Sequence, residues 1–255
     1  MSTVSRRGVL LGAAGAALGL AGCGASGPRR RSGTLRSRHW PDHDIRWEMA
    51  LPDSGRGASP LVVVLHGKSG SARSAFDSLH LDEHVAATGL TIASVDGGDS
   101  YWHRRRSGVD TGAMVVDDFL PLARNEGGYG GPVALLGWSM GGYGALLLAS
   151  QLGREGVGAV VAESAALWTG PGASASGAFD DREDFVAHDV FDRADVLAGL
   201  PVRLDCGDRD PFVAANRAFA KVLPSATLTV DAGGHTNTYW REHARGQLEW
   251  IAKQL

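Results

Sequence analysis

From residue 44 onward, short runs of aliphatic and β-branched residues alternate with longer amphipathic stretches. The run from Leu61 to Leu65 is apolar throughout, as expected of a strand buried on both faces of a parallel sheet. We predict further strands at 90–95, 133–136, 157–162, 202–204 and 226–230, an edge strand at 44–51, and helices at 72–87, 111–123, 141–152, 211–222 and 238–254. This alternation predicts an α/β domain with a mostly parallel sheet flanked by helices.

One interval interrupts the alternation. Residues 165–199 carry no strand signal, begin with small residues and then become acidic. We expect this segment to be an excursion over the carboxyl edge of the sheet, where a cap or substrate loop is commonly found. Ligands of open parallel sheets bind at that same edge, so the chemistry is expected there.

A G-x-S-x-G sequence follows the strand signal at 133–136 and precedes a helical stretch. In a chain with 36 glycines the five-residue motif alone is weak evidence, because it can occur by chance. A strand before it and a helix after it are the context of a nucleophile elbow. The flanking glycines permit a sharp turn that exposes the serine hydroxyl. The motif predicts Ser139 as the nucleophile.

A serine nucleophile needs a general base and an acid that orients it, and in this kind of fold the acid precedes the histidine in the chain. Asp208 and Asp210 both follow the strand at 202–204; we favour Asp210, which has G-x-x-D spacing, and keep Asp208 as the alternative. His235 follows two glycines at the next strand end and is the predicted base. Its downstream rivals lie in the excursion and in the last predicted helix: His188 and His243.

Acyl transfer also needs N–H donors for the oxyanion. We expect them to be the backbone N–H groups of Met140 and of Lys68, with Ser69 as the alternative to Lys68. His66 in the same loop is expected to shape the loop rather than to catalyse. Three tryptophans near strand ends are candidates for an acyl or aromatic pocket, with core packing as the equal alternative: Trp102, Trp138 and Trp168.

Charge is divided unevenly along the chain. Residues 1–38 hold seven arginines and no acid, which leaves 18 basic and 28 acidic side chains, a charge of −10, on residues 39–255. An acidic body argues against nucleic-acid binding. The acidic residues between 180 and 195 lack ligand spacing and are typical of a solvated face, so we expect no metal, and serine chemistry needs no cofactor.

The N-terminus resembles an export signal. Arg6-Arg7 precede an apolar stretch of 14 residues, too short to span a membrane, and resemble a twin-arginine signal. Leu20 to Cys23 resemble a bacterial lipobox, whose cysteine carries lipid. We expect a signal peptide at 1–22, a flexible linker at 23–43 whose arginines lie in solvent or against anionic lipid, and a hydrolase domain at 44–255. The protein is then anchored through Cys23 to the outer face of the cytoplasmic membrane, or secreted.

With these residues in view, the chain resembles the α/β-hydrolase superfamily, in particular the esterase group that includes S-formylglutathione hydrolase, feruloyl esterases and secreted mycolyltransferases. The resemblance lies in the elbow at 139–146, the acid loop at 205–212 and the histidine segment at 233–240, and spans about residues 45–253. It implies an α/β-hydrolase fold and a triad of Ser139, Asp210 and His235. Trp138 and the excursion depart from the group, and these are the places that select substrate.

These features predict a carboxylic ester hydrolase that forms an acyl-enzyme with a small-molecule, lipid or sugar ester. Two alternatives fit the same fold: an envelope acyltransferase with the same triad, and a non-catalytic binding lipoprotein. Product analysis with an added alcohol separates transfer from hydrolysis. Absence of both turnover and fluorophosphonate labelling would favour the binding protein.

Overall fold

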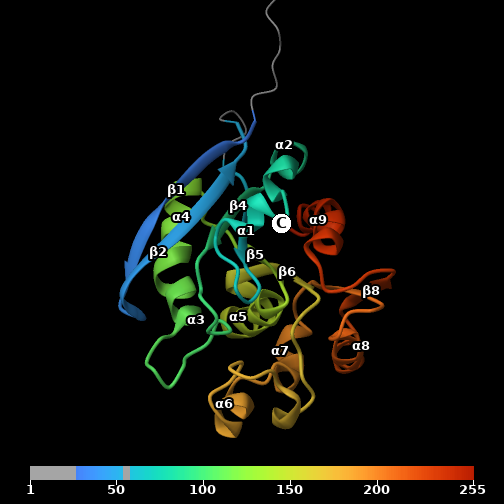
Figure 1. The fold of residues 1–255 in the computed structure, drawn as a ribbon. Coiled ribbons are helices and arrows are strands. Elements are labelled where there is room, and N and C mark those ends of the chain that lie inside the picture. The colour runs from blue at the N-terminus through green and yellow to red at the C-terminus, as the bar shows by residue number, and fades with distance from the viewer. Residues whose placement is uncertain (1–26, 54–57) are drawn as a thin grey trace, which may run out of the picture.

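A single eight-stranded sheet organises the chain (Figure 1). The computed structural model describes residues 27–53 and 58–255. The strand order is β1-β2-β4-β3-β5-β6-β7-β8; β3 to β8 are parallel, and β1 and β2 are antiparallel to their neighbours. The strands are β1 (Arg29–Ser37), β2 (Trp40–Leu51), β3 (Leu61–Leu65), β4 (Thr91–Val95), β5 (Val133–Trp138), β6 (Val157–Glu163), β7 (Val202–Gly207) and β8 (Thr227–Asp231). The predicted α/β class with a mostly parallel sheet is confirmed.

The helices occupy the stretches between the strands. They are α1 (Ser74–Asp77), α2 (Val85–Thr88), α3 (Thr111–Met114), α4 (Leu120–Gly127), α5 (Met140–Gly156), α6 (Arg182–Ala187), α7 (Ala194–Leu197), α8 (Val213–Val222) and α9 (Asn237–Ile251). A π-helical turn at Val115–Phe119 joins α3 to α4. Within α5, Gly153 leaves helical geometry, so the regular helix ends at the predicted residue 152. No helix in the described part of the chain is long and apolar enough to span a membrane.

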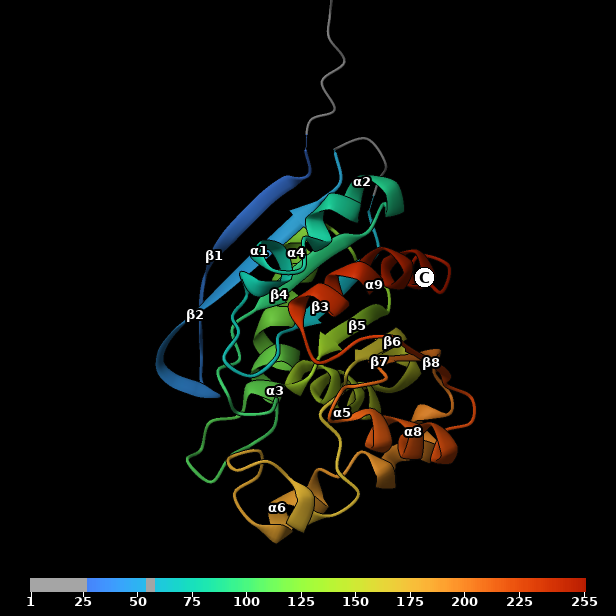
Figure 2. The ribbon, with the colours of Figure 1, turned by 45° about the vertical axis from the view of Figure 1, so that its right-hand side comes forward.

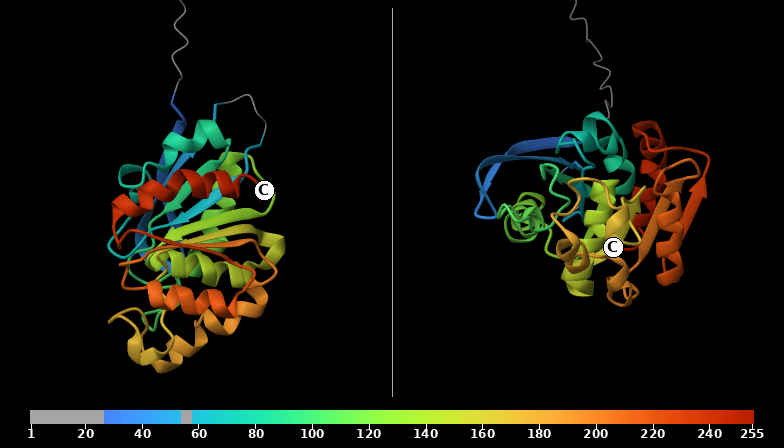
Figure 3. Two further views of the ribbon diagram at one scale, coloured as in Figure 1. Left: turned by 90° about the vertical axis from the view of Figure 1, so that its right-hand side faces the viewer. Right: turned by 60° about the horizontal axis from the view of Figure 1, so that its bottom comes forward.

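Helices cover both faces of the sheet (Figures 2 and 3). In β3, Val62 and Val64 point to a core formed with α1, α2 and α9, whereas Leu61, Val63 and Leu65 point to a second core formed with α3, α4, α5 and α8. All five side chains are fully buried. The uninterrupted apolar run of β3 follows from this burial on both sides.

The predicted linker at 23–43 is wrong over its described part, since residues 29–37 form the edge strand β1. β1 pairs along β2, so the strand expected at the edge lies one position inside it. Residues 29–37 show no apolar alternation, because β1 is held by backbone hydrogen bonds and ion pairs. Its arginines contact acids of the body rather than solvent or lipid alone: Arg30 with Glu48, Arg31 with Glu126, and Arg36 with Asp44. The predicted signal peptide and Cys23 lie outside the described residues.

The excursion at 165–199 contains α6, α7 and 3-10 turns, and no strand, as predicted. It lies beyond the end of the sheet, next to α5 (Figure 1). Tyr143, in the first turn of α5, donates its hydroxyl to the carbonyl of His188 at 2.8 Å. The excursion is thus attached to the helix that follows Ser139.

Candidate active site

Ser139 occupies the turn between β5 and α5, with a positive φ of 55° and ψ of −121°. A non-glycine residue rarely adopts a positive φ, and such strain is concentrated at functional sites. The turn is closed so tightly that a Cβ on Gly137 would lie 2.2 Å from the carbonyl oxygen of Gly141, and a Cβ on Gly141 1.9 Å from that of Leu65. Both glycines of the motif are therefore required by sterics.

The structure brings the three predicted residues into one hydrogen-bonded chain. His235 follows β8, and its Nε2 lies 2.9 Å from Ser139 Oγ. Its Nδ1 lies 2.8 Å from Oδ2 of Asp210, which follows β7. The Asp210 side chain is fully buried and that of His235 is 25% exposed, so the acid is shielded from water while the ring can be reached.

Asp210 is held as a carboxylate. Burial raises its pKa, but hydrogen bonds from His235, from the Phe212 N–H at 2.8 Å and from the Ser164 hydroxyl outweigh burial, and the net pKa lies below the ordinary value. A carboxylate can only accept, so Nδ1 of His235 carries the proton. The lone pair of Nε2 then points toward Ser139.

The alternative acid has a different task. Asp208 accepts the Gly233 N–H at 3.0 Å and pairs with Arg209 at 3.3 Å, so it fixes the loop that carries His235 rather than the ring. The rival histidines are bound elsewhere. His243 contacts Asp231 at 2.9 Å, and His188 contacts Asp184.

A cavity of about 480 Å³ opens beside Ser139 and His235. Its wall includes Lys68 and Ser69, but the Ser69 N–H already donates to Asp99 at 2.6 Å. Among the described residues the Lys68 N–H has no hydrogen-bond partner. Met140 begins α5, where the first N–H groups of a helix have no intrahelical acceptor. These two N–H groups are available beside the nucleophile.

His66 joins two loops at the carboxyl edge. Its Nε2 accepts the Gly97 N–H at 2.9 Å, and its Nδ1 lies 2.7 Å from the carbonyl oxygen of Gly67. Burial lowers its pKa, so the ring stays neutral. His66 therefore binds the loops after β3 and β4 together.

Only one of the three candidate pocket tryptophans lines the cavity. Trp138 does, whereas Trp102 is fully buried with its ring edge-on to His66 at 5.1 Å, so of the two alternatives for Trp102 core packing holds and the pocket role does not. Trp168 lines a separate hollow of about 440 Å³ beside Phe212. The cavity wall also contains residues that no sequence motif indicates. They come from the segment around α1 and from α9: Ser74, Ser78, Asn237 and Trp240.

A mostly parallel sheet with a strained serine after β5, hydrogen-bonded to a histidine after β8, defines the α/β-hydrolase class. The chain belongs to the family described as "Putative esterase", whose model matches residues 39–251. It is a carboxylic ester hydrolase. A search of curated proteins returned no match.

Solved structures share this fold. A ferulic acid esterase superposes with a TM-score of 0.76 at 21% identity, over 90% of this chain and 98% of that one. The fluorophosphonate-binding serine hydrolase FphF of Staphylococcus aureus gives 0.77 at 15% identity, over 89% and 99%. An S-formylglutathione hydrolase of Agrobacterium tumefaciens gives 0.77 at 16% identity, over 90% and 96%. Each of these solved chains is matched over nearly its whole length, so the present chain shares their fold throughout.

Proposed function

We propose that the protein hydrolyses carboxylic esters through an acyl-enzyme on Ser139, with His235 as general base and Asp210 as the acid that orients it. One observation carries the proposal: a single imidazole lies 2.9 Å from the serine hydroxyl and 2.8 Å from a buried carboxylate. The first distance is within reach for proton transfer from Ser139 to His235, and the second is a hydrogen bond that orients the ring.

In the first half of the reaction Ser139 Oγ attacks the ester carbonyl carbon, and its proton passes to Nε2 of His235. The negative charge moves to the carbonyl oxygen, which accepts hydrogen bonds from the N–H groups of Met140 and Lys68. Collapse of this intermediate breaks the bond to the alcohol, which leaves with the proton held by His235. The acyl group stays on Ser139.

In the second half, water takes the place of the alcohol. His235 removes a proton from water as it attacks the acyl carbon, and returns that proton to Ser139 Oγ when the acid leaves. Asp210 remains ionised throughout and stabilises the imidazolium. Removing one such oxyanion donor in a comparable site costs about 2.7–4 kcal/mol in the transition state, which is why both N–H groups matter.

The cavity supports an ester that carries a ring with hydroxyl substituents. Trp138 and Trp240 provide apolar surface, with ring centroids 6.2 Å apart. The polar residues Ser74, Ser78 and Asn237 line the same space. The ferulic acid esterase that shares the fold acts, by its name, on an ester of this kind.

A fluorophosphonate probe tests the proposal directly. It is expected to label the wild-type protein at Ser139 and not Ser139→Ala, while an ester panel that varies acyl length and aromaticity defines the substrate. The matched control is Ser150→Ala, which should label normally. Ser150 lies in α5, the helix that follows Ser139, and its hydroxyl donates to the Leu147 carbonyl. Labelling that survives Ser139→Ala refutes the assignment.

A further inference from the structure

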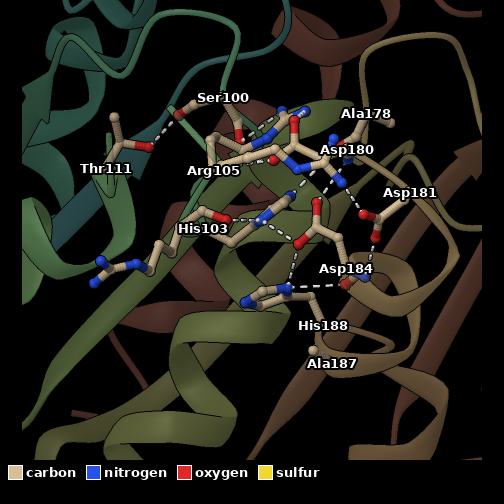
Figure 4. Close-up of polar contacts among 12 residues, drawn as sticks. Ser100, His103, Arg105, Thr111, Ala178, Asp180, Asp181, Asp184, Ala187 and His188 are labelled. Carbon is tan, nitrogen blue, oxygen red and sulfur yellow. Dashed lines mark hydrogen bonds and ion pairs between the residues drawn. The ribbon is translucent and has the colours of Figure 1, made fainter. Parts of the chain in front are cut away.

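A second cluster of titratable side chains lies where the excursion meets the loop after β4 (Figure 4). It consists of His103 from that loop, Asp184 from α6 and His188 at the end of α6. Nδ1 of His188 lies 2.9 Å, and Nδ1 of His103 3.5 Å, from Oδ1 of Asp184. One nitrogen or oxygen of each residue lies within 4.8 Å of those of the other two.

The hydrogen bonds around His103 leave one ring nitrogen without a donor. Nε2 lies 3.1 Å from the carbonyl oxygen of Ala178, and Nδ1 lies 3.0 Å from that of Arg104 as well as near Asp184. All of these neighbours are acceptors. A neutral histidine has one N–H, so if Nε2 donates to Ala178, the lone pair of Nδ1 faces oxygen atoms. A cation between them would relieve this repulsion.

The two histidine rings of the cluster lie against each other. The His103 side chain is fully buried, and the ring of His188 stacks on it with centroids 4.4 Å apart. Protein and the second ring therefore enclose His103, and the two histidines are held side by side next to Asp184.

The charge of Asp184 is not neutralised by a nearby arginine in the described part of the chain. Arg105 pairs with Asp180 at 2.9 Å, and Arg106 pairs with Asp181. Among the described residues, the ion-pair partners of Asp184 are His103 and His188 alone. Oδ2 of Asp184 accepts the Asp180 N–H at 2.7 Å, so Oδ1 is the oxygen that remains available to a cation.

We propose that His103 Nδ1, Asp184 Oδ1 and His188 Nδ1 form a binding site for a divalent transition-metal ion of the zinc type. Two histidines and one carboxylate are a common three-ligand set for Zn²⁺. Ligands about 2.1 Å from a tetrahedral ion are about 3.4 Å apart. The separation of 3.5 Å between His103 and Asp184 matches this value, whereas the 2.9 Å between His188 and Asp184 must lengthen when an ion binds. Nε2–H of His103 then donates to Ala178, the carbonyl contact that usually orients a metal-bound histidine.

The site is reachable from solvent and joins distant parts of the chain. A hollow of about 310 Å³ borders Asp184 and His188, which gives an ion and a water ligand access. His103 belongs to the loop after β4, and His188 is bound through its carbonyl to Tyr143 of α5. An ion here would fix the excursion to the sheet and to the helix that follows Ser139.

The sequence prediction of no metal rested on the acidic run alone. That run contains two of the three ligands, but His103 lies some 80 positions earlier and is brought in by the fold. Nothing in the local spacing could have indicated it. The site is separate from the triad, so it does not depend on the proposed ester chemistry.

Tag-free full-length protein, stripped with a chelator, would be titrated with Co²⁺ and Zn²⁺. We expect one Co²⁺ per chain with the visible absorption of a tetrahedral ion, its displacement by Zn²⁺, and a higher Tm with Zn²⁺. His188→Ala and Asp184→Asn should each weaken binding by about 100-fold or more, since a direct ligand matters at least as much as an outer-shell partner. The two variants alter different side chains, so a folding defect in one leaves the other informative.

His80→Ala is the matched control, because His80 is also partly exposed and lies 3.1 Å from a carboxylate, that of Glu83. It should bind Co²⁺ like the wild type. A wild-type protein that binds no Co²⁺ overturns the proposal, as does undiminished binding by both His188→Ala and Asp184→Asn. Esterase activity should persist in the stripped protein, which distinguishes failure of this site from failure of the triad.

Discussion

The substitution Asp210→Asn tests how the acid acts on His235. In the wild type, Oδ1 of Asp210 accepts the Phe212 N–H and Oδ2 faces Nδ1 of His235. Asparagine has one oxygen and one NH₂ group. The Phe212 N–H can only donate, so it bonds to the oxygen of the asparagine side chain and leaves the NH₂ group facing His235.

This arrangement reverses the tautomer of the His235 ring. Nδ1 must then accept, which places the ring proton on Nε2, and Nε2–H can no longer take the proton of Ser139. In a comparable triad the wrong tautomer lowers kcat by about 10⁴-fold. At 1.36 kcal/mol per tenfold, that is about 5.4 kcal/mol of transition-state stabilisation. We expect a loss of this size with the fold intact.

The assay is kcat/KM on a soluble aryl ester, with circular dichroism to confirm folding. Asp208→Asn is the matched control: its oxygen can still accept the Gly233 N–H at 3.0 Å, so activity should stay within a few-fold of the wild type. The reasoning is refuted if Asp210→Asn keeps more than a tenth of wild-type activity, or if Asp208→Asn loses as much.

Three further substitutions have defined outcomes. Gly141→Ala should lower the free energy of unfolding by about 3 kcal/mol in urea titrations, because the new Cβ meets the Leu65 carbonyl. Gly130→Ala is the control, since open space surrounds that position, and equal effects of the two substitutions would contradict the steric account. Burial and the neighbouring charge of Asp205 raise the pKa of Glu163, so the folded state holds a proton that the unfolded state releases above about pH 4.5, and the stability of the wild type falls as pH rises. Glu163→Gln should therefore gain stability over the wild type increasingly above that pH. A pH-independent difference would be evidence against this. Cys23→Ala should move the protein from the membrane to the soluble fraction, and continued membrane binding would exclude a lipid on that residue.

The residues of the proposed triad could be predicted because each of them follows a strand signal. Ser139, Asp210 and His235 stand at the ends of β5, β7 and β8, and parallel strands bring their carboxyl ends to one edge. The choice between Asp208 and Asp210 depended on loop geometry, since both lie within reach of the same strand end. Only the structure shows that Asp208 binds backbone while Asp210 binds the ring.

Features that depend on distant partners could not be predicted. β1 has few apolar residues, and its stability comes from pairing with β2 and from acids such as Glu48 and Glu126. Trp102 follows a strand like a site residue, but the loop turns it beneath His66 into the core. In each case the deciding contact joins residues far apart in sequence, so local periodicity carries no signal of it.

The position of β1 limits how an anchored domain could face a membrane. Arg29 pairs with Leu51, and β2 pairs with β4 so that Ala50 faces Ile92 and Trp47 faces Val95. The first residue of β1 therefore lies at the amino edge of the parallel strands, opposite the edge that carries Ser139. From Cys23 to Arg29 there are six Cα–Cα steps, which reach at most about 22 Å. If Cys23 carries a lipid, the amino edge of the sheet is therefore the edge held toward the bilayer, and the edge that carries Ser139 faces away from it.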